Sequence, residues 1–295
     1  MINAIADKQP APLPDDGKIL RAKLLHESPW RWCERHMLGA AYSLRGKRVT
    51  ELADIFRRPR RVRLPTQQDI GRHGAGFSGF LRDSQPETIL AAARRGFFPR
   101  AHVGPQKWWS PAERAVMHIG EVHIPKPLRR TLRTSDVTIS FDTAFEAVLS
   151  GCAERRPGRP HLTWITPGCA RIYLDLHDRG HAHSVEVRDG AGALIGGLFG
   201  VSVGPVFSAL SMFHTRNDAS KIGIVSLYHH LESWGYAAVD HETLSAWVAQ
   251  LGARLVPRAD YARLLQGTPS AHDAPGLWQA ELALKETADW VPGQA

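Results

Sequence analysis

The stretch GHAHSVEVRDGAGALIGGLFGVSV, residues 180–203, decides the fold class. Two strand-like runs, 183–187 and 193–203, flank the turn-forming residues 189–192. Because a Gly- and Asp-containing turn between two such runs is typical of a β-hairpin, these glycines are interpreted as turn residues rather than as a phosphate-binding loop. The stretch therefore predicts two long strands that lie side by side.

Helices and further strands alternate around this hairpin. Patterns typical of helices occur in five segments: 145–152, 166–180, 217–235, 245–250 and 259–265. Apolar runs typical of buried strands occupy 206–213 and 236–239. Thr143 and Glu146 have the spacing of a capping box, and Thr166 before Pro167 is typical of a helix start. The order of elements predicts a mixed α/β (α+β) fold.

Composition divides the chain into four parts. We expect a basic, partly irregular N-terminal extension (1–75), a small N-terminal domain (76–118), the α/β domain (119–267) and a loose, Gly/Pro/Ser-rich tail (268–295). Within the extension, residues 30–44 have a helical pattern. The arginine-rich run 57–63 is interpreted as a solvated arm in preference to a polyphosphate-binding tail.

Charge and cysteine content narrow the class of protein. The formal net charge is +8 and the sequence pI is about 9.7, which fits either a polyanionic partner or an arginine-rich protein without one. Cys33, Cys152 and Cys169 have no CxxC spacing, so we expect neither a disulfide framework nor a zinc site, and a cytoplasmic location. The sequence shows no signal peptide and no membrane-spanning run.

Five histidines fall close together in two groups, which raises the possibility of a metal site. They are His177, His181, His183, His229 and His230. Their spacings match neither HExxH nor a Cys/His finger, and no cysteine is placed to complete such a set. We therefore expect no metal.

Nine short motifs occur in the order and spacing of one known family. They are GFFP (96–99), WWSP (108–111), GCA (151–153), TWIT (163–166), GHAHSVEV (180–187), GGLFGV (196–201), SMF (211–213), ASK (219–221) and LGA (251–253). On these motifs, which span about residues 76–265, the chain resembles the leucyl/phenylalanyl-tRNA–protein transferases.

The resemblance implies a small N-terminal domain followed by an acetyltransferase-like (GNAT-like) domain. It also implies transfer of Leu, Phe or Met from charged tRNA to proteins that begin with Lys or Arg, which marks those proteins for degradation. The partners would be aminoacyl-tRNA, as co-substrate, and a protein or peptide N-terminus. We expect no other cofactor, because the chain lacks the Gln/Arg-x-x-Gly-x-Gly/Ala motif that holds the pyrophosphate of acyl-CoA.

The family assigns proton transfer to an Asp-x-Gln motif, and the matching residues here are Asp240 and Glu242. Two carboxylates two residues apart on one strand face can raise the pKa of one of them, so Glu242 is a candidate base. The other interpretation is an exposed strand-end residue, with the role of the glutamine lost.

Three more positions depart from the family pattern. Leu210 stands where the family has Glu, Arg100 where it has Trp, and Ala93 where it has Tyr. In the family that Glu lies in the catalytic pocket. Its replacement by Leu210 puts the preference for a basic acceptor, and activity itself, in question.

The resemblance also implies a substrate-binding set and a tRNA-binding set. The apolar donor pocket would be lined by Leu198, Phe207, Leu227 and Val239, with Tyr173, Leu210, Ser211, Met212 and Phe213 also expected to contact substrate. Trp164 is either a stacking platform for the terminal adenine or a core tryptophan. The tRNA-binding residues would be Lys126, Arg129, Arg130 and Arg133, which share one side if their segment is helical, and Lys221.

Three functional interpretations remain open from the sequence. The first is an aminoacyl-tRNA–dependent transferase that acts on N-terminal Lys or Arg. The second keeps the tRNA donor and changes the amine acceptor, and the third is a non-catalytic protein that binds tRNA or N-termini.

Overall fold

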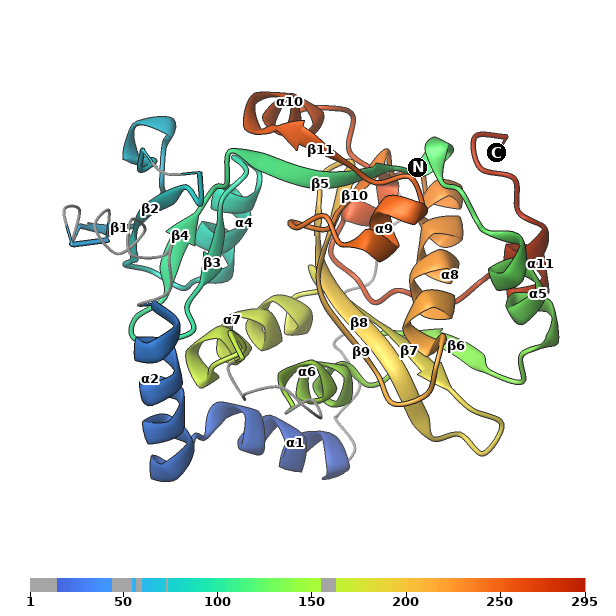
Figure 1. The fold of residues 1–295 in the computed structure, drawn as a ribbon, viewed down its shortest axis with the longest axis horizontal. Coiled ribbons are helices and arrows are strands. Elements are labelled where there is room, and N and C mark those ends of the chain that lie inside the picture. The colour runs from blue at the N-terminus through green and yellow to red at the C-terminus, as the bar shows by residue number, and fades with distance from the viewer. Residues whose placement is uncertain (1–14, 44–54, 57–59, 73, 155–162, 295) are drawn as a thin grey trace, which may run out of the picture.

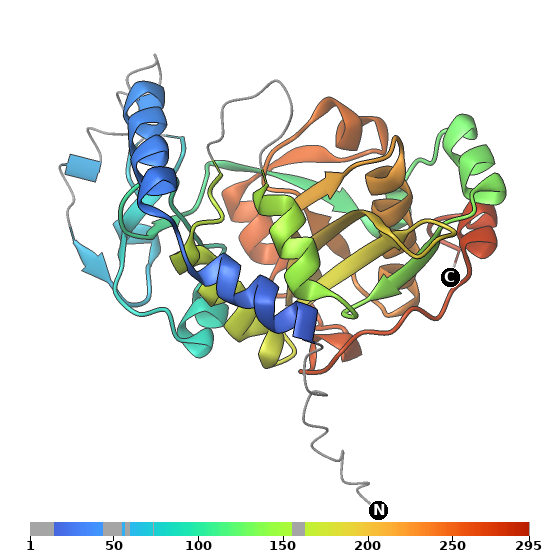
Figure 2. The same cartoon turned by 90° about the horizontal axis from the view of Figure 1, so that it is seen from below.

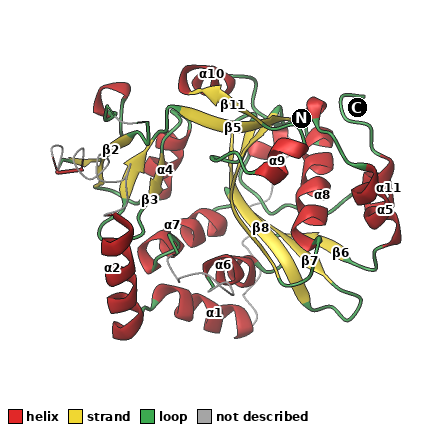
Figure 3. Cartoon of the chain, in the orientation of Figure 1, coloured by secondary structure: helices red, strands yellow, loops and turns green. Residues whose placement is uncertain are grey.

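The structure, a computed structural model, describes residues 15–43, 55–56, 60–72, 74–154 and 163–294. Its strands form two sheets that lie side by side, with helices packed around them (Figures 1 and 3). The smaller sheet contains, in spatial order, β1 (Arg61–Val62), β2 (Phe77–Leu81), β4 (Lys107–Trp109) and β3 (Phe98–Arg100).

The larger sheet has seven strands. In spatial order they are β11 (Arg254–Pro257), β5 (Glu113–His118), β10 (Ala238–Asp240), β9 (Val206–His214), β8 (Leu194–Val203), β7 (Ala182–Arg188) and β6 (Thr138–Phe141). β9 and β10 pair in parallel, whereas all other neighbours in this sheet pair antiparallel. The predicted mixed α/β (α+β) class is confirmed, and the finer acetyltransferase-like description stays a prediction.

Helices pack around both sheets. They are α1 (Asp15–Leu25), α2 (Pro29–Ser43), α4 (Pro86–Ala93), α5 (Lys126–Thr134), α6 (Phe145–Ala153), α7 (Pro167–Asp178), α8 (Ala219–Ser233), α9 (Ala246–Gln250), α10 (Arg258–Leu264) and α11 (Leu284–Asp289). Three short 3-10 turns are η1 (Gln67–Asp69), η2 (Ile119–Glu121) and η3 (Ala271–Asp273). α6 and α7 lie on one face of the sheet and α8 on the other (Figure 1).

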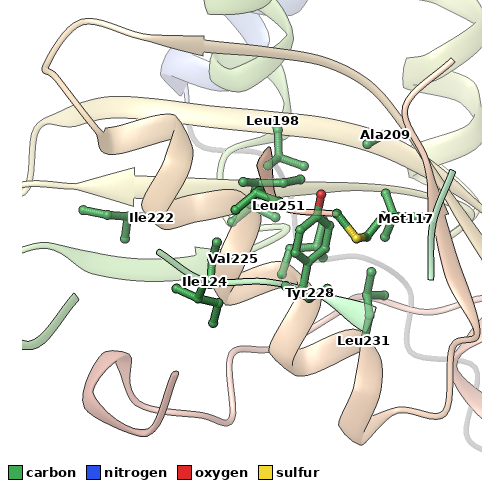
Figure 4. Close-up of a cluster of buried hydrophobic side chains, with 14 of the residues drawn as sticks. Met117, Ile124, Leu198, Ala209, Ile222, Val225, Tyr228, Leu231 and Leu251 are labelled. Atoms are coloured by element: carbon green, nitrogen blue, oxygen red, sulfur yellow. The ribbon is translucent and has the colours of Figure 1, made fainter. Parts of the chain in front are cut away.

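The main core lies between α8 and the larger sheet. Figure 4 shows Ile222, Val225 and Leu231 of α8 beside Leu198 of β8 and Met117 of β5. All of these side chains are at most 3% exposed. Burial of each such side chain contributes about 1.5–3 kcal/mol, so this cluster contributes strongly to stability.

The predicted hairpin is confirmed as β7 and β8. In its turn the backbone N–H of Gly192 donates to Asp189, and the Asp189 carboxylate accepts from the N–H groups of Ala191 and Ala193. At a register shift in β8, Gly200 has no side chain because a Cβ there would lie 2.5 Å from the ring of Phe207. This glycine lets β8 and β9 approach closely.

The predicted capping box at Thr143 and Glu146 is wrong. The residue before α6 is Ala144, and its side chain makes no cap. Glu186 of β7 takes this place instead: it accepts from the Thr143 hydroxyl at 2.8 Å and, more weakly, from the backbone N–H groups of Thr143 and Ala144. By contrast, Thr166 caps α7 as predicted, because its hydroxyl accepts from the N–H of Cys169.

The expected loose C-terminal tail is also wrong. Trp278 is 4% exposed, stacks on His183 at 3.8 Å between ring centroids, and donates its backbone N–H to Asp142. Further along, Arg129 of α5 donates to the carbonyl groups of Ala288 and Trp290. The Gly/Pro/Ser-rich composition predicted a loose segment, whereas two buried tryptophans, Trp278 and Trp290, pack it against the core.

The N-terminal part contains two helices, of which the sequence predicted α2. α1 lies across α6 and α7 (Figure 2), and Arg21 of α1 forms an ion pair with Asp178 of α7. Residues 57–59 of the arginine-rich run lie outside the described part of the chain, and residues 61–62 form β1. Strands β5, β6 and β11 were not predicted, and β5 places residues 113–118 in the larger sheet.

Candidate active site

Asp240, at the end of β10, is fully buried and surrounded by hydrogen-bond donors. Arg114 of β5 donates to both carboxylate oxygens of Asp240. The Ser208 hydroxyl (3.3 Å) and the Tyr261 hydroxyl (3.1 Å) donate to one of these oxygens. The other oxygen accepts the backbone N–H of Glu242 at 2.9 Å. Both carboxylate oxygens of Asp240 are therefore already hydrogen-bonded within the protein.

The register of the sheet places Arg114 beside Asp240. Asp240 pairs with Val116 in the antiparallel ladder, so Arg114, two residues away on β5, faces the same side. The Arg114 guanidinium is buried and lies 4.8 Å from the ring centroid of Phe98 and 4.6 Å from that of Tyr261. These rings exclude water from the ion pair.

Glu242 follows β10 in the left-handed backbone region, with φ of 58°. The hydrogen bond from its own N–H to Asp240 holds this conformation and turns its side chain inward. Glu242 is 8% exposed, so the interpretation as an exposed residue is wrong. Burial raises the pKa of Glu242 above its ordinary value, and the two arginines, Arg100 and Arg114, counter part of this rise.

Arg100, at the end of β3, forms an ion pair with Glu242. The Arg100 guanidinium lies 4.5 Å from the ring centroid of Trp164 and 5.1 Å from that of Phe98. Two atoms of this pair, Oε1 of Glu242 and Nε of Arg100, are buried and have no hydrogen-bond partner among the described residues. The pair joins the smaller sheet to the larger one and leaves two polar atoms for a ligand.

A mostly apolar cavity lies beside these ion pairs. It is lined from seven helices and strands, and the lining residues used below are Ala93, Phe98, Arg114, Tyr173, Leu210 and Tyr261. The cavity therefore combines apolar walls with buried charge, as binding sites for small apolar groups commonly do.

The predicted substrate-binding residues lie on both faces of the larger sheet. Leu198, Phe207, Leu227 and Val239 are fully buried against α8, and Met212 packs with them. Tyr173, Leu210, Phe213 and Trp164 pack on the opposite face, and Ser211 is half-buried in β9. Of the predicted set, Tyr173 and Leu210 line the cavity. The four residues predicted to line the donor pocket are instead buried in the core.

The predicted tRNA-binding residues lie on or near α5 and α8, and several have partners within the chain. Arg129 contacts the C-terminal segment, as described above, and Arg133 forms an ion pair with Asp289. Lys221 forms an ion pair with Asp218 and lies 4.9 Å from the ring centroid of Trp247. Lys126 and Arg130 are exposed. Their role in binding tRNA stays a prediction.

The histidines serve packing and hydrogen bonding. Nδ1 of His183 lies 2.8 Å from the Asp142 carboxylate, and Nε2 of His230 accepts from two backbone N–H groups. Within the described ranges, no group of three or more His, Cys, Asp or Glu side chains is arranged to hold a metal ion, and no helix is long and apolar enough to cross a membrane. Cys169 is fully buried in the core, as its helical position predicted.

Arg114 and Tyr261 were missed by the sequence analysis. A lone arginine directly before the apolar residues 115–117 was the available signal for Arg114, since a buried arginine needs a carboxylate partner. Tyr261 gave no comparable signal, because a tyrosine on a short helix is commonly part of a core.

Fold and site together define a mixed α/β protein with two ion-paired carboxylates at the end of β10, beside a mostly apolar cavity. A sequence model described as "Leucyl/phenylalanyl-tRNA protein transferase" matches residues 116–266. A relative of the same name from Aromatoleum aromaticum is 43% identical over 200 residues, which cover 67% of this chain and 83% of the relative. Another, from Xylella fastidiosa, is 36% identical over 234 residues, covering 79% and 96%. The chain belongs to the leucyl/phenylalanyl-tRNA–protein transferase family.

Among solved structures, FemX is 11% identical with a TM-score of 0.38, covering 50% of this chain and 60% of FemX.

Four positions that we expect to depart from the family pattern meet at this site. Ala93 and Leu210 line the cavity, and Arg100 and Glu242 contact each other beside it. Departures that are scattered along the sequence are therefore concentrated in one place in the fold.

Proposed function

We propose that the protein transfers Leu or Phe (or Met) from aminoacyl-tRNA to the N-terminal amine of proteins that begin with Lys or Arg. The transfer would mark those proteins for degradation in a bacterial cytoplasm, with aminoacyl-tRNA as co-substrate and no further cofactor. The observation that carries the proposal is the family match over 116–266, which includes Asp240, Glu242 and Tyr261.

The reaction needs a neutral amine, an ester held in place and a proton acceptor. The amine nitrogen forms a bond to the ester carbonyl carbon, and the bond from that carbon to the tRNA ribose oxygen breaks. The amine proton passes to a base and then to the ribose oxygen, so protons balance. Because the ester is already activated, positioning supplies most of the acceleration.

Glu242 fits the role of the base better than Asp240 does. Its Oε1 has no hydrogen-bond partner among the described residues, whereas Asp240 already accepts from four side chains and backbone groups. The raised pKa of Glu242 makes it a stronger base than an ordinary carboxylate. Asp240 would then act as a positioning residue that holds the backbone of Glu242.

The cavity suits the apolar part of a substrate. Ala93, Phe98 and Leu210 present apolar walls beside Glu242, and an apolar side chain such as that of Leu or Phe binds by burial rather than by polar contacts. Binding of the donor side chain on this face would leave the core around Leu198 and Phe207 undisturbed.

A second candidate function keeps the tRNA donor and uses an acceptor without a basic N-terminal residue. It is favoured by Leu210, which removes a carboxylate from the cavity, and by Arg100, which neutralises Glu242. A Lys or Arg side chain bound here would meet two arginines. Among the described residues of the site, both carboxylates already have a cationic partner. Charge therefore favours a neutral or acidic acceptor residue.

The test is transfer of labelled Leu and Phe from tRNA to peptides that differ only in the first residue: Lys, Arg, Ala or Asp. Preference for Lys and Arg supports the first proposal, and preference for Ala or Asp supports the second. Binding of charged tRNA with no transfer to any peptide would contradict both and support a non-catalytic role. Acetyl-CoA in place of charged tRNA is the donor control and should give no product.

A further inference from the structure

A second hollow lies outside the site, between the N-terminal helices and the body of the protein. It is lined by Lys23, His26, Glu27, Arg31 and Arg35 from the α1–α2 region. The opposite wall comes from the end of α6 and from the segment that enters α7, including Glu154, Thr163 and Ile165. We call it the α1–α2 groove.

The groove carries an excess of positive charge. Arg35 forms two hydrogen bonds to the carboxylate of Glu27, and it donates to the carbonyl of His102, so these two charges neutralise each other and fix α2. Lys23 and Arg31 are exposed and form no salt bridge with any other described residue. His26 lies in the same lining. Apart from Glu27, Glu154 is the one carboxylate among the described residues that line the groove.

The groove and the site are bordered by one short segment of the chain, residues 163–165. Thr163 and Ile165, which line the groove, directly flank Trp164 in the chain. The guanidinium of Arg100 lies over the ring of Trp164, and Arg100 forms the ion pair with Glu242. The segment 163–165 therefore borders both the groove and the Arg100–Glu242 pair.

Two exposed tryptophans flank the exposed arginine of the groove. Trp30 is 79% exposed and Trp32 is 50% exposed, and both are immediate neighbours of Arg31 on α2. The ring of Trp32 also lies 3.9 Å, between centroids, from the ring of His36. Aromatic rings alternating with cations are the surface on which single-stranded nucleic acid binds, because bases stack on rings and phosphates pair with cations.

We propose that the α1–α2 groove binds the phosphates of the single-stranded 3′ end of the tRNA donor. The inference rests on the proposed function and extends it to helices that lie outside the residues matched to the family. Of the predicted tRNA contacts on α5, Arg129 and Arg133 already bind the C-terminal segment, whereas Lys23 and Arg31 are exposed and line the groove.

The test compares two double variants of the full-length protein. Lys23→Glu/Arg31→Glu reverses charge in the groove, and Arg188→Glu/Arg216→Glu makes the same change of net charge at the end of the larger sheet remote from α2 (Figure 1). The probe is an RNA hairpin with a short single-stranded 3′ tail, and the same hairpin without a tail is the ligand control. Binding is measured by fluorescence anisotropy over a range of salt concentrations.

We expect the groove variant to bind the tailed hairpin about tenfold more weakly, because two phosphate contacts are lost. The slope of log affinity against log salt should become shallower by about 1.4, since each single-strand contact contributes about 0.7. The blunt hairpin and the control variant should behave as wild type. A milder variant, Lys23→Gln/Arg31→Gln, removes the two charges without reversing them. It should weaken binding in the same direction, which tests the inference even if the charge-reversal variant misfolds.

Transfer assays separate this inference from the proposed function. The groove variant should raise KM for Leu-tRNA with kcat unchanged, and it should leave transfer from 3′-leucyl-adenosine, which has no phosphate, unaffected. Equal binding of the tailed hairpin by the groove and control variants would overturn the inference. It would also be overturned if an acidic peptide displaced the labelled hairpin and unlabelled tailed RNA did not. If wild type transfers nothing while the groove variant loses RNA binding, the groove assignment stands and the proposed function fails.

Discussion

Arg100 and Glu242 lie 142 residues apart in the chain and meet as an ion pair against the ring of Trp164. In the family pattern both positions hold uncharged residues, Trp at the first and Gln at the second. A charge of one sign at either position alone would be buried without a partner. The two replacements are therefore a compensated pair, and each makes the other tolerable.

Replacing Arg100 alone should destabilise the protein. Arg100→Trp leaves the Glu242 carboxylate buried without its guanidinium, and the free energy of unfolding should fall by about 1–3 kcal/mol, less than for a fully buried pair because Arg100 is partly exposed. Arg100→Trp/Glu242→Gln, which restores the family residues, should recover most of this loss. Urea unfolding of the single and double variants gives the coupling energy, and additive effects would contradict compensation.

Replacing Asp240 should have a larger effect on stability. Asp240→Asn keeps the size of the side chain but leaves Arg114 buried without a counter-charge, which costs about 3–5 kcal/mol. Ser208→Ala removes one neutral donor to the same carboxylate and should cost about 1 kcal/mol. Chemical denaturation measures both, and an Asp240→Asn protein as stable as wild type would contradict the positioning role.

The pH dependence of transfer should report two groups. The acceptor amine must lose a proton, with a pKa near 8, and Glu242 must be ionised, with a pKa that burial raises above its ordinary value. As pH falls, log kcat/KM should therefore decline with a slope near one and then, below the pKa of Glu242, with a slope near two.

Glu242→Gln provides the control for this profile. It should lower the rate by about 10²–10⁴-fold and leave a slope near one at all acidic pH values. A variant that keeps the second slope would exclude Glu242 as the base.

His241 should make the fold sensitive to acid. Burial lowers its pKa from 6.5 to about 4, and its Nε2 lies 2.6 Å from the hydroxyl of Tyr228. Between these two pH values the unfolded chain binds a proton that the folded protein does not, so stability falls as pH falls from 6.5 towards 4. The full loss is roughly 3 kcal/mol.

The measurement is the free energy of unfolding at pH 7 and pH 5 for wild type and for His241→Gln. The variant should lose less stability than wild type on acidification. It should keep some pH dependence, because burial also lowers the pKa of His183 and His230. Equal losses in the two proteins would show that His241 is not the sensitive group.

The C-terminal segment should be needed for stability. Trp278→Ala removes a buried ring that packs on His183 and Phe207, and it should cost about 3–5 kcal/mol. Leu277→Ala changes the exposed neighbouring residue and should cost little. A thermal melt of each variant checks this, and equal melting temperatures would contradict a packed segment.

Local chemistry explains what the sequence predicted well. The hairpin of β7 and β8 follows from turn residues 189–192 and from the runs beside them, and the cap of α7 follows from Thr166 and Pro167. Such features depend on residues close in the chain, so a single sequence contains the whole signal. Asp240 and Glu242 came from the resemblance, and the structure adds that they share a site.

Long-range pairing explains what the sequence did not predict. Strand β5 contains Arg114 among apolar residues, and that arginine is stable there because of Asp240, which is distant in sequence. Glu186 replaces the expected cap of α6 for the same reason, since it comes from another element. The tail was misjudged because composition, which averages over a segment, gives little weight to Trp278 and Trp290.

The Arg114–Asp240 ion pair has a consequence for synthesis of the chain. Asp240 leaves the ribosome 126 residues after Arg114, which at ordinary elongation rates is roughly 6 to 25 s later. During that interval β5 has no counter-charge for its arginine, and it also lacks β10 and β11, its two neighbours in the larger sheet. The nascent protein must therefore keep β5 open to water until most of the chain has emerged, and the part of the sheet that holds the site closes late in synthesis.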